Sequence, residues 1–124
     1  RKELTDEWEK AGVKEGFEFA ILTDEISKAW TGMTTREYKN LKDLKKENLR
    51  DNMTNLELVL NMLAETATTE ISKKEEPAGL EPSKKIAKRG GSIAGNARKQ
   101  IESETGKPAI TSENWRTRKD KLLK

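Results

Sequence analysis

Residues 54–73, TNLELVLNMLAETATTEISK, decide the fold, because they have the pattern of one long amphipathic helix with a defined start. The helix opens on a capping box, in which the Thr54 hydroxyl and the Glu57 carboxylate each accept the backbone N–H of the other residue. Beyond it, apolar residues recur every three or four positions and form a stripe along one side. The stretch is predicted to be the longest helix of the chain.

Shorter helices are predicted on the N-terminal side of this stretch, over residues 1–12, 16–31 and 34–41, with a further one that ends at about residue 52. Thr34 and Glu37 form a second capping box, which starts the third of them. The last two helices, with a turn near residues 43–46, match the spacing of a helix-turn-helix, whose second helix enters the major groove of DNA. Short paired helices are common in any α-protein, so a core role explains the same spacing.

Prolines and glycines divide the C-terminal half of the chain. A stretch near residues 75–82, EEPAGLEP, has no periodicity and indicates a linker, after which a basic helix is expected to end before Gly106. The predicted segments are a helical core domain, a linker, a basic helix, and a polar, mobile tail, over residues 1–76, 77–82, 83–106 and 107–124. The sequence therefore predicts a small all-α domain of five or six helices.

Composition excludes several classes of protein. The 124 residues contain no cysteine and no histidine, which removes disulfides, thiolate zinc sites and Ser-His chemistry. No apolar run is long enough to span a bilayer, and nothing resembles a signal peptide. We therefore expect a cytoplasmic protein without enzymatic activity, metal, cofactor or small-molecule substrate. Because the chain opens on Arg1 and not on methionine, we expect it to be a trimmed fragment of a longer protein.

The basic helix is the first candidate functional site. Residues 82–101 contain six basic side chains and no acidic one, although the net charge of the chain is only +3. On a helical wheel, glycines fall between the cations of one face, which would let a phosphate backbone approach closely. The predicted nucleic-acid-binding residues are Lys84, Lys88, Arg98, Lys99, Gly91 and Gly95. Two alternatives remain open: a solvated basic face, and a glycine strip that packs against another helix.

A leucine-rich seam is the second candidate site. Apolar residues continue the stripe of the long helix backward in steps of three and four, and such a seam pairs helices in coiled coils. The predicted self-association residues are Leu49, Met53, Leu56, Leu60 and Leu63. The seam covers fewer than three heptads, so it is also compatible with a helix that packs into the core of its own domain.

Four segments carry a resemblance to a known family. Residues 42–58, together with 18–22 (EFAIL), 95–101 (GNARKQI) and 106–108 (GKP), resemble in order and spacing the C-terminal half of bacterial DNA-damage-inducible protein D. Related chains are labelled phage antirepressors with a BRO-type N-terminal domain. The resemblance covers roughly residues 3–114. It departs from the family in two respects: the BRO-type domain is absent, and Asp43 stands where a glycine is expected.

The resemblance implies a bacterial C-terminal domain tied to the DNA-damage response or to phage repressor control, without assigned catalytic or ligand residues. The expected function is a macromolecular interaction, with nucleic acid through the basic helix or with a repair or repressor protein. The alternative is a structural module that dimerises the full-length protein. Expected partners are therefore DNA, such a protein, or a second copy of the chain, and no membrane.

Overall fold

The structure, a computed structural model, describes the backbone of residues 2–123 and the side chains of residues 2–119. This part of the chain forms six α-helices and one 3-10 turn, η1, and contains no strand. The elements are α1 (Lys2–Lys10), α2 (Phe17–Thr31), α3 (Thr35–Leu41), η1 (Arg50–Asn52), α4 (Asn55–Glu75), α5 (Leu80–Thr105) and α6 (Trp115–Leu123). The predicted all-α class is confirmed. Arg1 and Lys124, the outer ends of two predicted segments, lie outside the described residues.

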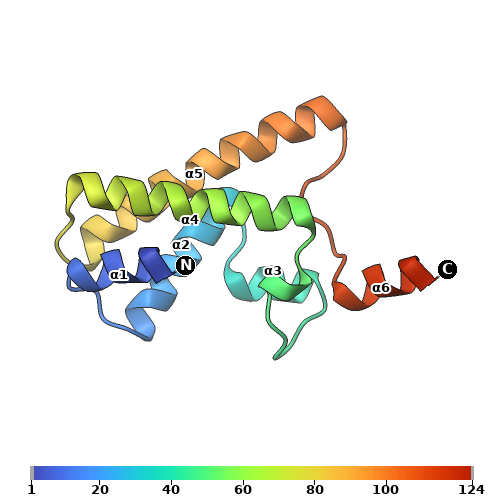
Figure 1. The fold of residues 1–124 in the computed structure, drawn as a ribbon, viewed down its shortest axis with the longest axis horizontal. Coiled ribbons are helices and arrows are strands. Elements are labelled where there is room, and N and C mark those ends of the chain that lie inside the picture. The colour runs from blue at the N-terminus through green and yellow to red at the C-terminus, as the bar shows by residue number, and fades with distance from the viewer. Residues whose placement is uncertain (1, 124) are drawn as a thin grey trace.

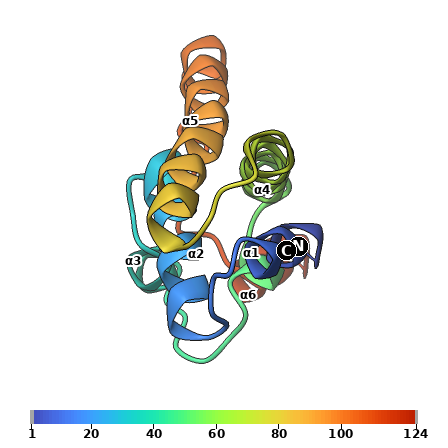
Figure 2. The same cartoon turned by 90° about the vertical axis from the view of Figure 1, so that its left-hand side faces the viewer.

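Helix α5 organises the packing, since both α2 and α4 lie against it (Figure 1 and Figure 2). Glycines make these contacts close. A Cβ added at Gly90 would lie 2.7 Å from the Thr68 Cα of α4, and one added at Gly91 would lie 2.8 Å from the Ile26 carbonyl oxygen of α2. At both crossings, therefore, the glycine lets the two backbones approach closely, beside the Thr68 hydroxyl of α4 and the Ala29 methyl of α2.

Helix α5, with 26 residues, is longer than α4, with 21, which corrects the expectation that the 54–73 stretch would be the longest helix. Two adjacent glycines inside a helix cost roughly 2 kcal/mol relative to alanines, and this cost favours an interruption of the helix at Gly90 and Gly91. The helix runs through both residues because two neighbouring helices pack on them and offset that cost.

The helix also begins earlier than expected, at Leu80, so the predicted linker over residues 77–82 is shorter. Gly79, with a φ of 87°, precedes the first turn, and its carbonyl accepts the Ser83 hydroxyl at 2.8 Å. The Gly79 N–H donates to the Ala11 carbonyl at 2.6 Å, which joins the linker to the end of α1. The basic helix is consequently packed into the same core as the segments before it.

The two predicted capping boxes form. Thr34 and Glu37 exchange hydrogen bonds of 2.9 and 3.2 Å at the start of α3, and the accepted N–H of Thr34 is the first reason that the pKa of Glu37 lies below its ordinary value. Thr54 and Glu57 do the same at the start of α4, at 3.0 and 3.2 Å. Both helix starts are therefore determined by residues within one turn of the helix.

The predicted short helix before residue 52 is only the single turn η1, so the segment has no second helix that fills a major groove. Side chains bind the backbone here instead of leaving it free for a helix: the Glu47 carboxylate accepts the N–H groups of Lys45 and Lys46, each at 3.1 Å. The Asn48 side chain likewise accepts the Asp51 N–H at 3.2 Å. Such local bonds compete with helix formation.

In the C-terminal segment, predicted to be a polar and mobile tail over residues 107–124, residues 109–118 contact the rest of the domain, and α6 begins at Trp115. Ala109 and Asn114 are buried. Asn114 caps α6 by accepting the Thr117 N–H at 3.0 Å, and its side-chain amide donates to the Lys42 carbonyl at 2.9 Å. The Trp115 N–H donates to the Asn52 side chain at 2.9 Å. Polar contacts therefore join this segment to the rest of the domain.

Candidate nucleic-acid interface

Two of the four predicted cations, Lys88 and Arg98, contact α2. Lys88 and Lys99 are exposed, whereas Lys84 and Arg98 are half-buried. The Lys88 ammonium lies 3.9 Å from the Glu25 carboxylate of α2. Because α5 is continuous, 100° per residue places Lys84, Lys88 and Lys99 within about 60° of one another on the helix. The structure thus brings these three lysines to one side of α5.

The two predicted glycines do not face solvent. Gly91 and Gly95 are buried against α2, where an added Cβ at Gly95 would lie 2.8 Å from the Ala29 carbonyl oxygen. This corrects the expectation that they let a phosphate backbone approach. A helix strip without side chains allows another backbone to approach closely, and here the backbone of α2 occupies that position. The two glycines therefore have the role given by the alternative interpretation, that of a strip that packs against another helix.

Arg98 is committed to the fold. Its guanidinium donates to the carbonyls of Trp30 and Thr31, both at 3.1 Å, and so caps the C-terminal end of α2. It also binds the Glu102 carboxylate at 3.2 Å, and that carboxylate accepts the Ala109 N–H at 2.9 Å. The Ala109 bond first, and Arg98 after it, hold the pKa of Glu102 below its ordinary value. Arg98 is thus a structural cation.

Counter-charges occupy part of the remaining basic helix. Arg89 pairs with Glu75 of α4 at 2.8 Å, and this bond lowers the pKa of Glu75. Within the described part of the chain, Lys84, Lys85 and Lys99 make no ion pair. The cations that remain available for a phosphate backbone are thus lysines, with Lys88 only loosely bound to its partner.

The seam residues are divided between core and surface. Met53 and Leu60 are buried, Leu49 and Leu56 are partly buried against the same core, and Leu63 is 37% exposed. The structure therefore does not bring the five residues to one free face. Four of the five residues therefore pack in or against the core of their own domain, in line with the core alternative.

An apolar surface nevertheless remains on the outside of α4. Val59 is 53% and Met62 is 52% exposed, next to the partly exposed Leu63. Ile93, on α5, is 45% exposed. Exposed apolar side chains gathered on one helix are typical of a surface that contacts another protein.

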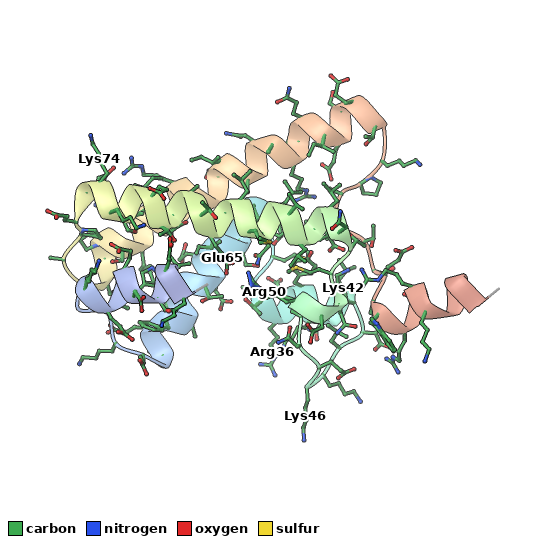
Figure 3. All side chains as sticks on the ribbon, viewed as in Figure 1. Arg36, Lys42, Lys46, Arg50, Glu65 and Lys74 are labelled. Carbon is green, nitrogen blue, oxygen red and sulfur yellow. The ribbon has the colours of Figure 1, made fainter. Side chains whose placement is uncertain are left out.

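A buried polar cluster, which sequence reasoning missed, lies where α3, α4 and the C-terminal segment meet (Figure 3). Lys42 and Glu57 are both fully buried and lie 2.8 Å apart. The Lys42 ammonium also donates to the carbonyls of Thr111, at 2.9 Å, and Glu113, at 2.5 Å. The second carboxylate oxygen of Glu57 accepts the Tyr38 hydroxyl, and burial, with this bond, raises the pKa of Tyr38. All three ammonium protons are therefore satisfied.

The only sequence signal for this cluster was the capping box, which singled out Glu57. That residue serves twice, because Glu57 Oε1 accepts both the Thr54 N–H and the Lys42 ammonium. Nothing in the sequence distinguishes Lys42 from the other lysines around it. Its other partners are backbone carbonyls. Every residue has one, so the sequence contains no pattern that would reveal these contacts.

Comparison with known proteins identifies the domain. The family model described as the DinD C-terminal domain matches residues 1–120. The chain belongs to this family. The resemblance in residues 42–58 and their neighbouring segments is thereby confirmed. A search of curated proteins and a search of solved structures found no match.

Two kinds of feature are absent from the part of the DinD C-terminal domain that the structure describes, a metal-binding cluster and a membrane-spanning helix. The described residues contain no group of three or more acidic side chains that would hold a metal ion. None of the described helices is both long and apolar enough to cross a bilayer.

Proposed function

We propose that this DinD C-terminal domain is a non-enzymatic binding domain that contacts nucleic acid through lysines of α5. One observation carries the proposal: α5 is unbroken through its glycine pair, so Lys84, Lys88 and Lys99 form one row. At 1.5 Å per residue the row is about 22 Å long. Residues 82–101 contribute no acidic side chain to it. A row of lysines suits phosphates, which supply most of the affinity for nucleic acid that does not depend on base sequence.

Salt dependence tests this proposal. Three phosphate contacts predict that the logarithm of the affinity for a DNA duplex falls against the logarithm of salt with a slope of about −2.7. Between about 50 and 200 mM salt the affinity is expected to fall about 40-fold. The measurement is fluorescence anisotropy of a labelled duplex. The triple variant Lys84→Gln, Lys88→Gln, Lys99→Gln should flatten the slope.

A matched control removes the same charge elsewhere. Lys14, Lys74 and Lys107 are exposed and lie outside the row. Changing these three to glutamine should leave most of the duplex affinity intact. Equal losses in the two triple variants would show that net charge alone attracts the duplex, and no binding at the lower salt would exclude the α5 contact altogether.

Self-association is the second candidate function, and the exposed apolar side chains of α4 favour it. Val59 and Leu63 are one helical turn apart on its outer side and lack cover in the described chain. If a second copy covers them, Val59→Ser with Leu63→Ser should halve the particle mass in light scattering while the helix content is kept. Leu60, which is buried, is unsuitable for this test because its loss would unfold the chain. A wild-type chain that is already monomeric at high concentration would remove this candidate.

A further inference from the structure

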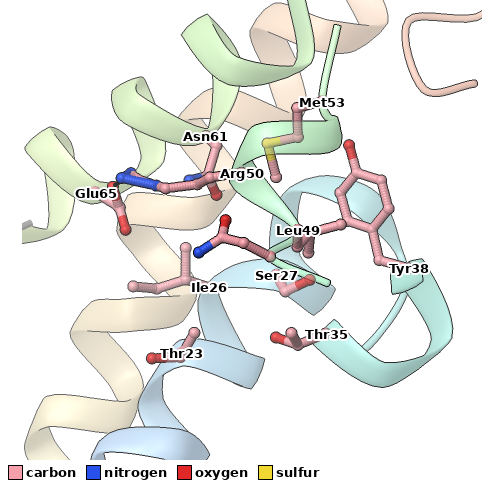
Figure 4. A pocket seen from close by; sticks show the side chains of 11 residues that line it. Thr23, Ile26, Ser27, Thr35, Tyr38, Leu49, Arg50, Met53, Asn61 and Glu65 are labelled. Carbon is pink, nitrogen blue, oxygen red and sulfur yellow. Dashed lines mark hydrogen bonds and ion pairs between the residues drawn. The ribbon is translucent and has the colours of Figure 1, made fainter. Parts of the chain in front are cut away.

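A pocket lies between α2, α3, η1 and α4, on the side of α2 that carries α3. Its volume is about 250 Å³, below the roughly 300–1,000 Å³ of pockets for larger ligands, so it accommodates one small group. Figure 4 shows Arg50 and Asn61 on one wall and Thr23 and Thr35 on the facing wall. Ile26 and Leu49 add apolar surface. The lining is thus a mixture of apolar side chains, neutral hydrogen-bonding groups and the oppositely charged side chains of Arg50 and Glu65.

The inner pocket is electrically neutral. Its cation, Arg50, is bound by the Glu65 carboxylate, and this pair lies at the same wall as Asn61 (Figure 4). Among the described residues the Asn61 side-chain amide makes no hydrogen bond, and the Asn48 side chain uses only its oxygen, toward the Asp51 N–H. Two amides therefore offer donors and acceptors without a net charge. Such a pocket favours a neutral polar group over a phosphate.

A second, wider hollow of about 550 Å³ adjoins the first, and Thr23 and Thr35 line both. Its lining contributes the cations Arg36, Lys39 and Lys45. The one carboxylate among the residues that line it, that of Asp24, accepts the Thr35 N–H at 3.1 Å. The outer hollow therefore has a positive excess, in contrast to the neutral inner pocket.

We propose that the two hollows together bind one nucleotide, with its base in the inner pocket and its phosphate in the outer hollow. Asparagine amides pair with the edge of a base through a donor and an acceptor, and apolar side chains pack on its faces. Guanidinium and ammonium groups bind the phosphate. A base enters such a pocket only when it is unstacked, so a free nucleotide or a single strand fits and a paired duplex does not. The site is separate from the α5 row.

Binding to the intact chain tests the pocket, with dAMP followed by calorimetry and a labelled single-stranded 12-nucleotide DNA followed by anisotropy. Asn61→Leu should lower the affinity for both probes about fivefold or more. It removes an amide that pairs with the base edge, and the loss of one such contact lowers the affinity by about this factor. Arg36→Gln with Lys39→Gln should weaken both probes and reduce the salt slope of the single strand by about 1.4. If neither variant weakens either probe, the proposal is overturned.

Two comparisons complete the experiment. Tight binding of the single strand with weak binding of dAMP would identify a strand as the source of the nucleotide, whereas equal binding would identify a free nucleotide. The α5 triple variant serves as the control, since it should keep its dAMP affinity. The Asn61→Leu variant should in turn keep its duplex affinity and its unfolding midpoint in urea. The pocket and the α5 row are thus tested independently, and loss of dAMP binding in the α5 variant would contradict the pocket.

Discussion

Changing Lys42 to methionine is expected to destabilise the domain by about 3–5 kcal/mol, because it leaves a buried carboxylate without its cation. Glu57 keeps the Tyr38 hydroxyl and the Thr54 N–H, but the carbonyls of Thr111 and Glu113 lose their donor. Whole domains are stabilised by about 5–15 kcal/mol, so the loss is a large share of the total. Urea unfolding, followed by circular dichroism, measures it.

The control for this variant is Lys46→Met, an exposed lysine of the same region, which should change the free energy of unfolding by no more than about 0.5 kcal/mol. Glu57→Gln combined with Lys42→Met should cost less than the two single changes added together, since residues in one network are coupled. A loss below about 1 kcal/mol in Lys42→Met would mean that water, and not protein, surrounds the ammonium.

Changing Gly90 to alanine is expected to destabilise the domain by about 1–3 kcal/mol or more, although helix propensity alone predicts a gain of about 1 kcal/mol. The added Cβ would lie 2.1 Å from the Thr68 hydroxyl oxygen and 2.7 Å from both the Cα and the N of Thr68. Two helices would have to separate. The two effects have opposite signs, so the direction of the change in the urea midpoint decides between them.

Two companion variants sharpen this test. Ser92→Ala lies on an exposed position of the same helix and should be neutral or slightly stabilising. Thr68→Ala removes the nearest hydroxyl but not the backbone atoms, so it should rescue Gly90→Ala only in part. Full rescue would place the obstruction in the side chain, and a stabilised Gly90→Ala would mean that α4 and α5 do not meet at this residue.

Local signals explain which parts of the fold could be predicted. The helix starts at Thr34 and Thr54 depend on residues three positions apart, and both form as predicted. The end of α2 before Gly32 is equally local, since Gly32 adopts a left-handed φ of 80°. The helix predicted before residue 52 shortens to the single turn η1 because the Glu47 and Asn48 side chains bind neighbouring backbone groups, which a count of apolar residues does not show.

The candidate sites were harder to predict because a helical wheel shows which residues share a face but not what covers that face. Gly91 and Gly95 fall beside cations on the wheel, and yet α2 covers them. Arg98 was assigned to a nucleic-acid surface, although its partners are carbonyls 67 and 68 residues away. The inner pocket gave no signal in the sequence, since its lining comes from four separate elements, α2, α3, η1 and α4.

The Lys42 cluster also sets the order in which the domain can be completed during synthesis. Its ammonium donates to carbonyls that lie 69 and 71 residues further along the chain, so these bonds form only after that part has been made. On the ribosome the N-terminal elements emerge first, so α3 and α4 meet while the lysine is still hydrated. Only the arrival of residues 111–114 expels that water and closes the longest loop of the fold. Residues 111–114 are therefore made after the other groups of the cluster, and they complete the burial of the Lys42 ammonium, so the domain should gain its full resistance to proteolysis only once they have docked.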